Sequence, residues 1–466
     1  MSDRIDNLRP LQDWSHEMKR DWDDRARQDA KWFINPLAFR QTDAEFDDTG
    51  ASAVQRLLMD DLDLLSPGRD PRSLRVLELG CGIGRMTKFL AAAFGEVYAT
   101  DVSGEMIRQA QQRLAGQSNV QLFETSGYDF AALPDEHFDL VFSAFVFQHV
   151  PSADIISSSL RDAYRTLRTG GAFKFETNSI TSFDFEEIEK DTWLGASFPE
   201  GEIRRFAEEV DAQIISLDGS GTQYCWTILR KRSPQAERSF ASGLPRIEFH
   251  GRTDRPESKQ VPINGEHSSL TILVSGLVRE AVDCNSVCID ISGLEIWPHY
   301  VGPLRKAFAS YAGPAIGAAD DVLTRIDLRL PVGAPTGDAE VRLRLSSGET
   351  SQPVPVEFVL PPPVIPLIRA IMNGADLGTD VLARGAKSLL RLHVEGLDET
   401  ADNGNVRVRV GERIVKPSFV GLLSGLGLYR VDAQLPGDID PGPTQLSLYF
   451  GNIESPAVKL VVLTEE

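Results

Sequence analysis

The sequence predicts an α/β domain with a mainly parallel sheet, preceded by a helical segment and followed by an all-β half. Three observations support this. Between residues 76 and 231, apolar runs alternate with helical patterns, which is the order of a parallel sheet with crossover helices. Before that region, apolar residues recur every four positions in a polar stretch. After Arg232, short runs of alternating apolar and polar residues are separated by proline and glycine, as in antiparallel sheets.

The first predicted strand, residues 76–79, ends in a turn rich in glycine. The glycines are Gly80, Gly82 and Gly84. Glycine allows a positive φ and lets a ligand approach the backbone where a Cβ would collide with it. The spacing differs from the G-x-G-x-x-G of a dinucleotide-binding turn, which argues against an NAD-dependent dehydrogenase. The turn therefore predicts close backbone contact with a different ligand.

A second predicted strand, residues 97–100, ends at an acid. Asp101 stands 21 residues after Gly80. In nucleoside-binding folds an acid at this place accepts hydrogen bonds from ribose hydroxyls. Asp is also a common helix N-cap, but Ser103 is available for capping, so the ribose role is favoured. Glu78, directly before the glycine turn, is either a strand-end charge or a ligand contact, and its position favours the contact.

The other elements of the α/β domain follow in alternation. Strands are predicted at residues 119–123, 138–143, 172–176, 213–217 and 223–231, and helices near residues 154–168 and 202–210. Ligands bind at the carboxyl ends of parallel strands, so the glycine turn and Asp101 are expected at one edge of the sheet. Tyr224 and Trp226, in the last strand, are interpreted as packing residues.

Five motifs stand in a characteristic order between residues 50 and 232. They are VLELGCGIGRMT, ATDVSGEMIRQAQQR, DEHFDLVFSAFVFQHV, LRTGGAFKFET and GTQYCWTILRK. In this order the region resembles a class I S-adenosylmethionine-dependent methyltransferase. The resemblance implies a Rossmann-like fold whose final strand runs antiparallel to the others, and S-adenosylmethionine as cofactor.

The resemblance also implies roles for single residues. Glu78, Gly80, Gly82 and Gly84 line the methionine and ribose side of the cofactor, Asp101 binds the ribose hydroxyls, and Val102 and Met106 lie near the adenine. The acid or amide that usually contacts the adenine amino group is not plainly present. Asp129 is the first choice for that contact and Ser126 the second. Cys81 lies within the glycine turn, where a small residue is needed for packing.

His149 has two interpretations. It ends the predicted fourth strand, at the rim where an acceptor would meet the methyl group. A neutral imidazole there can take a proton from an attacking hydroxyl or amine. Alternatively, the ring is structural and bonded to nearby backbone. Catalysis does not require it, because the sulfonium is already a good leaving group and alignment of the acceptor can supply much of the rate.

Two further segments border this domain. In residues 1–49 a narrow apolar stripe predicts a helix that either packs on the edge of the sheet or caps the cofactor pocket. The stripe consists of Trp14, Met18, Trp22, Ala26 and Ala30. Residues 178–200 contain aromatic residues that line an acceptor pocket or form a small satellite core. These residues are Phe183, Phe185, Trp193 and Phe198.

The second half is predicted to form two β-sandwich domains, residues 240–360 and 364–466, joined by a proline-rich linker. Residues 330–343 match residues 435–448 at an offset of 105, and residues 269–277 match residues 388–397. The pattern resembles immunoglobulin-like domains of the IPT/TIG type. Such domains can recognise a glycan or protein acceptor, associate with a second copy of the chain, or position the enzyme. Trp297, His299, Tyr300 and Tyr311 are candidates for stacking on sugars.

Composition limits the function. The formal net charge is −20, which argues against nucleic acid as a substrate. No apolar run reaches 18 residues, so no membrane span is expected. The four cysteines lack the spacing of a zinc site or a disulfide framework, so no metal is predicted and a cytoplasmic location fits.

The sequence therefore predicts a methyltransferase that acts on oxygen or nitrogen of a small molecule or glycan. The alternative is a non-catalytic scaffold that binds the cofactor and uses its β-sandwich domains to bind a glycan or protein.

Overall fold

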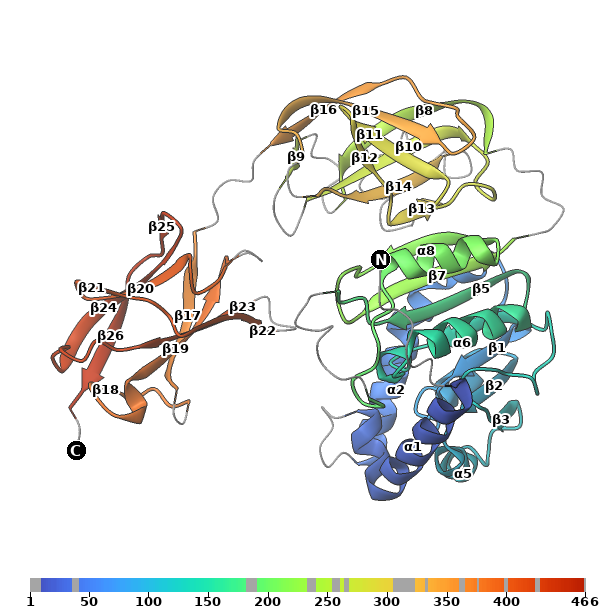
Figure 1. Ribbon diagram of the computed structural model, residues 1–466, viewed down its shortest axis with the longest axis horizontal. Coiled ribbons are helices and arrows are strands. Elements are labelled where there is room, and N and C mark those ends of the chain that lie inside the picture. The colour runs from blue at the N-terminus through green and yellow to red at the C-terminus, as the bar shows by residue number, and fades with distance from the viewer. Residues whose placement is uncertain are drawn as a thin grey trace. The chain divides into compact units, whose positions relative to one another are not determined.

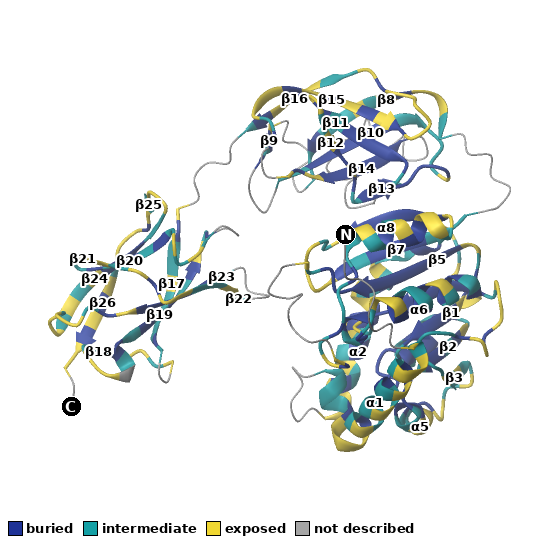
Figure 2. Ribbon diagram, in the orientation of Figure 1, coloured by how far each residue is buried: buried dark blue, intermediate teal, exposed yellow. Residues whose placement is uncertain are grey.

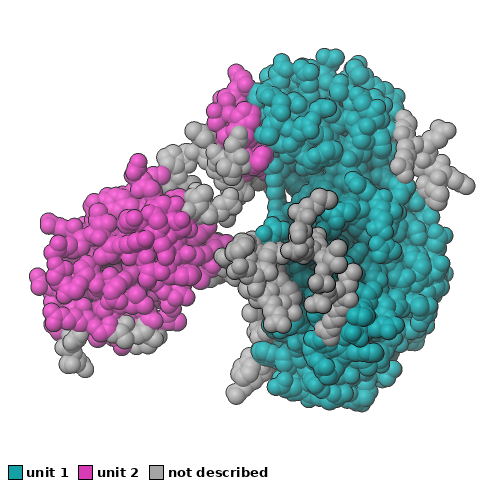
Figure 3. All heavy atoms as spheres, viewed as in Figure 1, with its two compact units in different colours: residues 1–259, 270–329, 339–356 teal, residues 260–269, 330–338, 357–466 magenta. Residues whose placement is uncertain are grey.

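The structure is a computed structural model. It describes residues 10–35, 42–181, 191–232, 240–253, 260–263, 268–304, 323–331, 334–359, 365–374, 377–397, 401–423 and 428–464 (Figure 1). Two compact units emerge from its contacts: residues 1–259, 270–329 and 339–356 form one, and residues 260–269, 330–338 and 357–466 form the other (Figure 3). The domain boundaries predicted from the sequence stay predictions.

The α/β domain contains a sheet with the strand order β3-β2-β1-β4-β5-β7-β6. The strands are β1 (Arg75–Leu79), β2 (Glu96–Asp101), β3 (Val120–Glu124), β4 (Phe138–Ser143), β5 (Leu167–Thr177), β6 (Ala212–Asp218) and β7 (Cys225–Lys231). Strands β1 to β5 run parallel to one another, while β7 runs antiparallel to both β5 and β6. This is the Rossmann-like arrangement that the sequence predicts.

Helices connect these strands and cover the sheet. They are α1 (Leu11–Ile34), α2 (Asp43–Leu57), α3 (Leu62–Leu65), α4 (Thr87–Ala93), α5 (Gly104–Arg113), α6 (Ala153–Thr166) and α8 (Glu200–Glu209). Short 3-10 turns add η1 (Met59–Asp61), η2 (Pro71–Ser73), η3 (Phe147–His149) and η4 (Ala386–Ser388). Local sequence sets the starts of several helices. Ser103 caps α5 by accepting from the Met106 amide, and Thr42 forms a capping box with Glu45 at α2.

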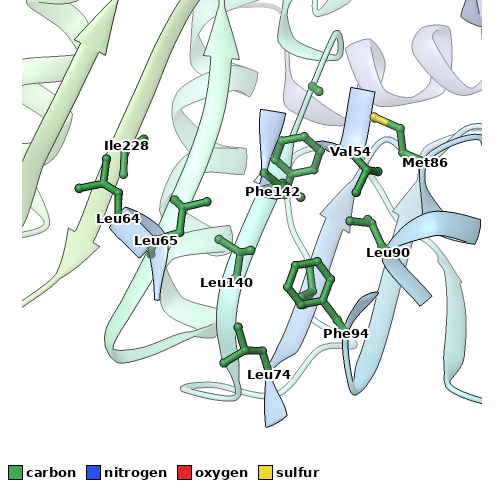
Figure 4. Close-up of a cluster of buried hydrophobic side chains, with 14 of the residues drawn as sticks. Val54, Leu64, Leu65, Leu74, Met86, Leu90, Phe94, Leu140, Phe142 and Ile228 are labelled. Atoms are coloured by element: carbon green, nitrogen blue, oxygen red, sulfur yellow. The ribbon is translucent and has the colours of Figure 1, made fainter. Parts of the chain in front are cut away.

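The main core of the α/β domain lies between one face of the sheet and helices α2, α3 and α4. Side chains on alternate positions of β1 and β4 point to this face, among them Leu140 and Phe142 (Figure 4). They pack against Val54, Leu90 and other apolar helix residues. The sheet strands are buried along most of their length, as expected where helices cover both faces of a parallel sheet (Figure 2).

The chain departs from the predicted fourth strand at its end. The sequence placed residues 147–149 at the end of that strand, whereas β4 stops at Ser143 and these residues form η3. Phe145 has a φ of +61°, which is outside the extended region and ends the strand. His149 therefore belongs to a turn and not to the sheet.

The sheet continues beyond the α/β domain. Its remaining strands are β13 (Tyr300–Gly302), β14 (Thr324–Arg329), β10 (Ser269–Leu277) and β8 (Ala241–Arg252). The junction is an antiparallel contact between Ser216 of β6 and Tyr300 of β13. A second sheet has the order β12-β11-β15-β16-β9. Its strands are β9 (Gln260–Pro262), β11 (Val287–Ile291), β12 (Leu294–Ile296), β15 (Gly337–Leu345) and β16 (Val354–Val359).

The last region, residues 365–463, contains two further sheets around a core of its own. One has the strands β17 (Leu367–Asn373), β19 (Leu389–Glu395), β23 (Leu428–Gln434) and β22 (Phe419–Leu423). The other has β18 (Val381–Leu382), β26 (Val458–Leu463), β24 (Gly442–Phe450), β20 (Val406–Val410) and β21 (Arg413–Val415), and β25 (Ile453–Glu454) pairs with β24. Alternate residues of β19 and β20 are buried, as the alternating sequence pattern predicts.

Candidate active site

The glycine turn after β1 is tightly enclosed. Gly80 has a φ of +69°, and a Cβ there would lie 2.3 Å from Val146 Cγ2. Gly82 has a φ of +55°, and its Cβ would lie 2.7 Å from Ile34 Cδ1. Both positions therefore need glycine for conformation and for space. The turn presents bare backbone at the carboxyl ends of β1 and β4, beneath the last residue of α1.

Asp101 ends β2 beside this turn. Its carboxylate accepts hydrogen bonds from the Gly82 amide at 2.8 Å and the Ser103 amide at 2.9 Å. Burial raises the pKa of Asp101 to about 6, and the backbone hydrogen bonds oppose that rise. The Val102 amide also bonds to this carboxylate, which has about four lone-pair positions, so acceptor capacity still remains for a ligand. Ser103 caps the helix itself, which leaves Asp101 free of that task.

Glu78 is almost completely buried, with 1% of its surface exposed. Its Oε2 accepts a hydrogen bond from Thr87 Oγ1 at 2.5 Å. Within the described residues, Oε1 has no hydrogen-bond partner. Burial raises the pKa of Glu78 to about 7. An unsatisfied buried carboxylate oxygen is costly, and a ligand group can satisfy it.

The other predicted cofactor residues lie around the same edge. Ser126 and Asp129 bond to each other, with Ser126 Oγ donating to Asp129 Oδ2 at 2.8 Å. Val102 lies next to Gly127, and Gly127 belongs to the loop that contains Ser126 and Asp129. Met106 is packed in a cluster with Ala26, Ala30, Phe46 and Ile83. Cys81 packs against Ala99 and Ile107, so its environment is that of a core residue.

Helix α1 lies across the loops at the carboxyl ends of β1, β2 and β3. Ser15 Oγ donates to the Ser126 carbonyl at 2.6 Å. Asp23 accepts from Ser103 Oγ at 2.6 Å and from the Glu105 amide at 3.0 Å. Ile34 stands over Gly82. These contacts place the helix on the ligand-binding edge of the sheet, which favours the cap among the two alternatives the sequence left open.

His149 uses both ring nitrogens within the protein. Nδ1 lies 2.7 Å from the Trp193 carbonyl, and Nε2 lies 3.2 Å from Gln148 Nε2. Because a carbonyl only accepts, the proton sits on Nδ1, and Nε2 accepts from the glutamine amide. Burial lowers the pKa of His149. A ring held in this way is neutral and has no free nitrogen, which favours the structural interpretation.

A cluster of aromatic rings holds α1 against the segment that begins at Asp191. Trp32 and Trp193 are parallel with centroids 6.2 Å apart, and Trp22 meets the His149 ring edge-on at 5.5 Å. The Arg25 guanidinium lies over Trp22, 4.7 Å from the ring centroid, and donates to the Thr192 carbonyl at 2.8 Å. Of the predicted acceptor-pocket aromatics, Phe198 is buried, while Phe183 and Phe185 lie outside the described residues.

Three residues of this edge were not identified from the sequence: Asp23, Arg25 and Thr87. Asp23 and Arg25 face α5 and Trp193, contacts between segments far apart in the chain, and no local pattern signals them. Thr87 carries a detectable signal, because a hydroxyl nine residues after Glu78 opens the helix after the turn. Within the described residues, no group of His, Cys, Asp and Glu is arranged to hold a metal ion.

The edge fits S-adenosylmethionine by its donors and acceptors. Asp101 has spare acceptor capacity for ribose hydroxyls, and Glu78 has an unsatisfied oxygen near the glycine turn. The turn itself has no side chain at Gly80, Gly82 and Gly84, the three positions where φ is positive and space is short. These residues would hold the cofactor, which supplies a methyl group on a sulfonium leaving group.

Comparison with known proteins indicates a methyltransferase domain. Residues 76–171 match a family model described as a methyltransferase domain. The chain is 33% identical over 155 residues to malonyl-[acyl-carrier protein] O-methyltransferase of Pseudescherichia vulneris, covering 33% of this chain and 57% of that protein. It is 33% identical over 127 residues to the ubiquinone biosynthesis O-methyltransferase of Xanthomonas oryzae pv. oryzae, covering 27% and 51%. The chain thus spans about half the length of the curated relatives it matches.

Among solved structures, magnesium protoporphyrin IX methyltransferase from Synechocystis PCC 6803 is 17% identical, with a TM-score of 0.35, covering 48% of this chain and 100% of that chain. An N-methyltransferase from Bradyrhizobium japonicum WM9 is 21% identical, with a TM-score of 0.30, covering 41% and 99%.

The fold, the site and the family match define the class. The chain carries a class I methyltransferase domain, the class of domain that uses S-adenosylmethionine as its methyl donor. None of the described helices has the length and apolar character needed to cross a bilayer.

Proposed function

We propose that this protein transfers the methyl group of S-adenosylmethionine to an oxygen or nitrogen atom of a small molecule or glycan. The observation that carries the proposal is the convergence of Asp101, Glu78 and the bare glycine turn on one edge of the sheet. Two of the relatives named above are O-methyltransferases, which supports oxygen as one of the two acceptor atoms.

In this proposal the residues of the edge divide the work of binding. Asp101 accepts hydrogen bonds from the ribose hydroxyls, and the backbone of Gly80 and Gly82 allows the ligand to lie close. Glu78 binds a polar group on the methionine side. Helix α1 excludes water from the site, as lids do in other enzymes. His149 holds the segment around Trp193 in place, and the rate arises from alignment of the acceptor atom.

Sheet pairs and alternating strands support the proposal that the β domains are of the immunoglobulin type. We propose that they recognise the acceptor or a protein partner, or join two copies of the chain. Of the aromatics considered for sugar stacking, Trp297 is 49% exposed, whereas Tyr300 is 4% exposed and packs in the core of the α/β domain. Tyr311 lies outside the described residues. His299 is half-buried, so Trp297 is the most exposed of the candidates that the structure describes.

Calorimetry with S-adenosylmethionine tests the proposal. Asp101→Ala should weaken binding by roughly 1–3 kcal/mol, the scale of hydrogen bonds to a charged group. Asp135→Ala is the matched control, because Asp135 lies in the turn before β4, at the opposite edge of the sheet, and pairs with Arg165. Equal losses in the two variants, or no binding by the wild type, would contradict the ribose assignment.

The pH dependence of the same measurement is a second test. Asp101 has a raised pKa of about 6, so its carboxylate becomes fully charged only as the pH rises through that value. Affinity should increase between about pH 5 and pH 8, and Asp101→Asn should remove most of that increase.

Turnover is tested separately by screening metabolite and glycan fractions for label from methyl-labelled cofactor. Binding without transfer to any fraction would favour the scaffold alternative.

A further inference from the structure

A further buried carboxylate, besides Glu78 and Asp101, lies at the ligand-binding edge, at the end of β5. Glu176 is 1% exposed. It lies on the same face of the sheet as Glu78, because Glu78, Phe142 and Lys174 are in register across β1, β4 and β5 and Glu176 is two residues beyond Lys174. With strands about 4.8 Å apart, two strand spacings separate the two carboxylates sideways by roughly 10 Å. Glu176 thus stands on the far side of β4 from the cofactor residues.

One oxygen of Glu176 is used and the other is not. Oε2 accepts a hydrogen bond from the Phe145 amide at 2.9 Å. Within the described part of the chain, Oε1 is buried and has no hydrogen-bond partner. Burial raises the pKa of Glu176 to about 7. The nearest cation along the strand, Lys174, is paired with Asp61 at 2.6 Å and does not satisfy this oxygen.

The backbone next to this carboxylate is strained. Phe145 has a φ of +61°, a conformation that a bulky side chain rarely adopts. Such strain costs about 1–3 kcal/mol and is concentrated at functional sites. Here it turns the Phe145 amide onto Glu176 and leaves the Phe145 ring 37% exposed.

Aromatic rings surround this corner. β7 is antiparallel to β5, so its start lies beside the end of β5, and Trp226 pairs with Glu176. The Tyr224 and Trp226 rings both meet the Phe145 ring edge-on, with centroids 6.3 and 6.1 Å apart. Tyr224 is 46% exposed, so it is not the packing residue that the sequence indicated. Burial, and then the charge of Glu176, raise the pKa of Tyr224. Tyr224 is exposed, and exposed side chains change rotamer in nanoseconds or less, so its ring can adjust to a ligand at this corner.

We propose that Glu176, Phe145 and Tyr224 form the acceptor subsite and that it takes a primary amine. Aromatic faces and an unpaired carboxylate together match an ammonium group, which forms cation–π contacts and a charge-assisted hydrogen bond. A hydroxyl group would use only the hydrogen bond. This inference rests on the proposed methyl transfer and narrows it to nitrogen.

The subsite also accounts for the proton that must leave the acceptor. An ammonium nitrogen has no lone pair, so it cannot accept a methyl group. Glu176 takes one proton from it on Oε1 and becomes neutral, and the amine keeps the electron pair of that N–H bond. That pair forms the new N–C bond while the C–S bond breaks and its electrons stay on sulfur. A carboxylate whose pKa lies near neutrality can take this proton and later release it.

Binding of a matched pair of probes to the full-length protein tests the subsite. Phenethylamine is a cation at about pH 8, and 2-phenylethanol has the same ring and chain with a neutral hydroxyl. Calorimetry is done with and without S-adenosylhomocysteine, whose own affinity is measured first. The wild type should bind phenethylamine about tenfold more tightly than 2-phenylethanol, the effect of one charge-assisted hydrogen bond.

Three variants separate the contributions. Glu176→Gln keeps an acceptor for the Phe145 amide and should abolish the preference for the amine while leaving S-adenosylhomocysteine affinity unchanged. Tyr224→Ala should weaken amine binding about threefold, and Tyr224→Phe, which keeps the ring, should not. Glu209→Gln is the control, because Glu209 is an exposed carboxylate on α8 paired with Arg161, and it should change nothing.

The outcomes distinguish this inference from the proposed function. Absence of S-adenosylhomocysteine binding would refute the proposed function itself. If S-adenosylhomocysteine binds normally, three results would overturn the subsite alone. They are no preference for the amine, no amine binding up to the solubility limit, and a Glu176→Gln protein that still prefers the amine. Tighter binding of phenethylamine than of 2-phenylethanol by the wild type, together with loss of that preference in Glu176→Gln, supports the subsite.

Discussion

At the scale of single residues, the site depends on positions where the backbone leaves no room for a side chain. Gly80 combines a φ of +69° with a neighbour 2.3 Å from the place of a Cβ. Gly170 has a similar φ of +76° but nothing within 4 Å of that place. The pair therefore separates backbone strain from steric collision.

Gly80→Ala should destabilise the protein by more than Gly170→Ala, which carries only the left-handed strain of roughly 1–2 kcal/mol. The collision with Val146 should add to that and should also displace the turn, so Gly80→Ala should lose cofactor binding while Gly170→Ala retains it. Chemical denaturation and calorimetry measure the two effects. Equal destabilisation with intact binding in both variants would show that the turn tolerates a side chain.

His149 makes a second residue-scale prediction. Its two internal hydrogen bonds hold the ring neutral, and its pKa is lowered by burial. His149→Ala should reduce thermal stability by about 1–3 kcal/mol through the unsatisfied Trp193 carbonyl and the lost ring contacts. If the ring is only structural, the pH–rate profile of the variant keeps the shape of the wild type. Loss of one limb of that profile would instead identify His149 as the proton acceptor.

At the scale of elements, the edge strand β6 explains how the first β region is attached. The Leu217 amide donates to the His299 carbonyl at 2.7 Å, and the Cys284 amide donates to the Ile214 carbonyl at 3.0 Å. Arg204 of α8 donates to the carbonyls of Cys284 and Pro298 at 2.7 and 3.0 Å. An open edge strand invites pairing with other chains, and these contacts cover it.

Arg204→Ala should therefore destabilise the protein by about 1–3 kcal/mol, because two buried carbonyls lose a charged donor. Arg205→Ala is the control, since Arg205 is exposed on the same helix and pairs only with Glu202 among its described contacts. Thermal unfolding of the two variants makes the comparison. A greater loss in Arg205→Ala would refute the bridging role of α8.

At the scale of the whole molecule, three buried carboxyl groups of the α/β domain and one of residues 365–463 have pKa values shifted in opposite directions. Glu78, Asp101 and Glu176, in the α/β domain, have pKa values raised to about 7, 6 and 7, so the folded state binds protons more readily there than the unfolded state does. Their contribution to stability falls as the pH rises from about 4 to 7. Asp432 of β23 has a lowered pKa despite burial, because Arg430 and Arg391 hold its charge. Its contribution is present at neutral pH and is lost as the pH falls below about 4.

Asp432→Asn should consequently destabilise residues 365–463 by about 3 kcal/mol at pH 7, since it leaves two arginines without their buried partner. The destabilisation should shrink as the pH is lowered, because the wild-type carboxyl then becomes neutral too. Hydrogen exchange followed by region, at several pH values, reports this. Exchange in residues 389–434 that is the same in variant and wild type at neutral pH would contradict it.

The sequence by itself determined the order of strands and helices, the glycine turn, Asp101 at the end of β2 and the change to β structure after Arg232. These depend on local features, namely periodicity, turn residues and short spacings, which are readable along the chain. Only the tertiary structure decided which polar groups have hydrogen-bond partners and which side chains are exposed. The bond of His149 to Trp193 and the contacts of Asp23 and Arg25 join segments up to 167 residues apart. The unpaired oxygen of Glu176 and the exposure of Tyr224 likewise follow from how the segments pack. Burial and partnership are set by packing between distant segments, and no local pattern encodes them.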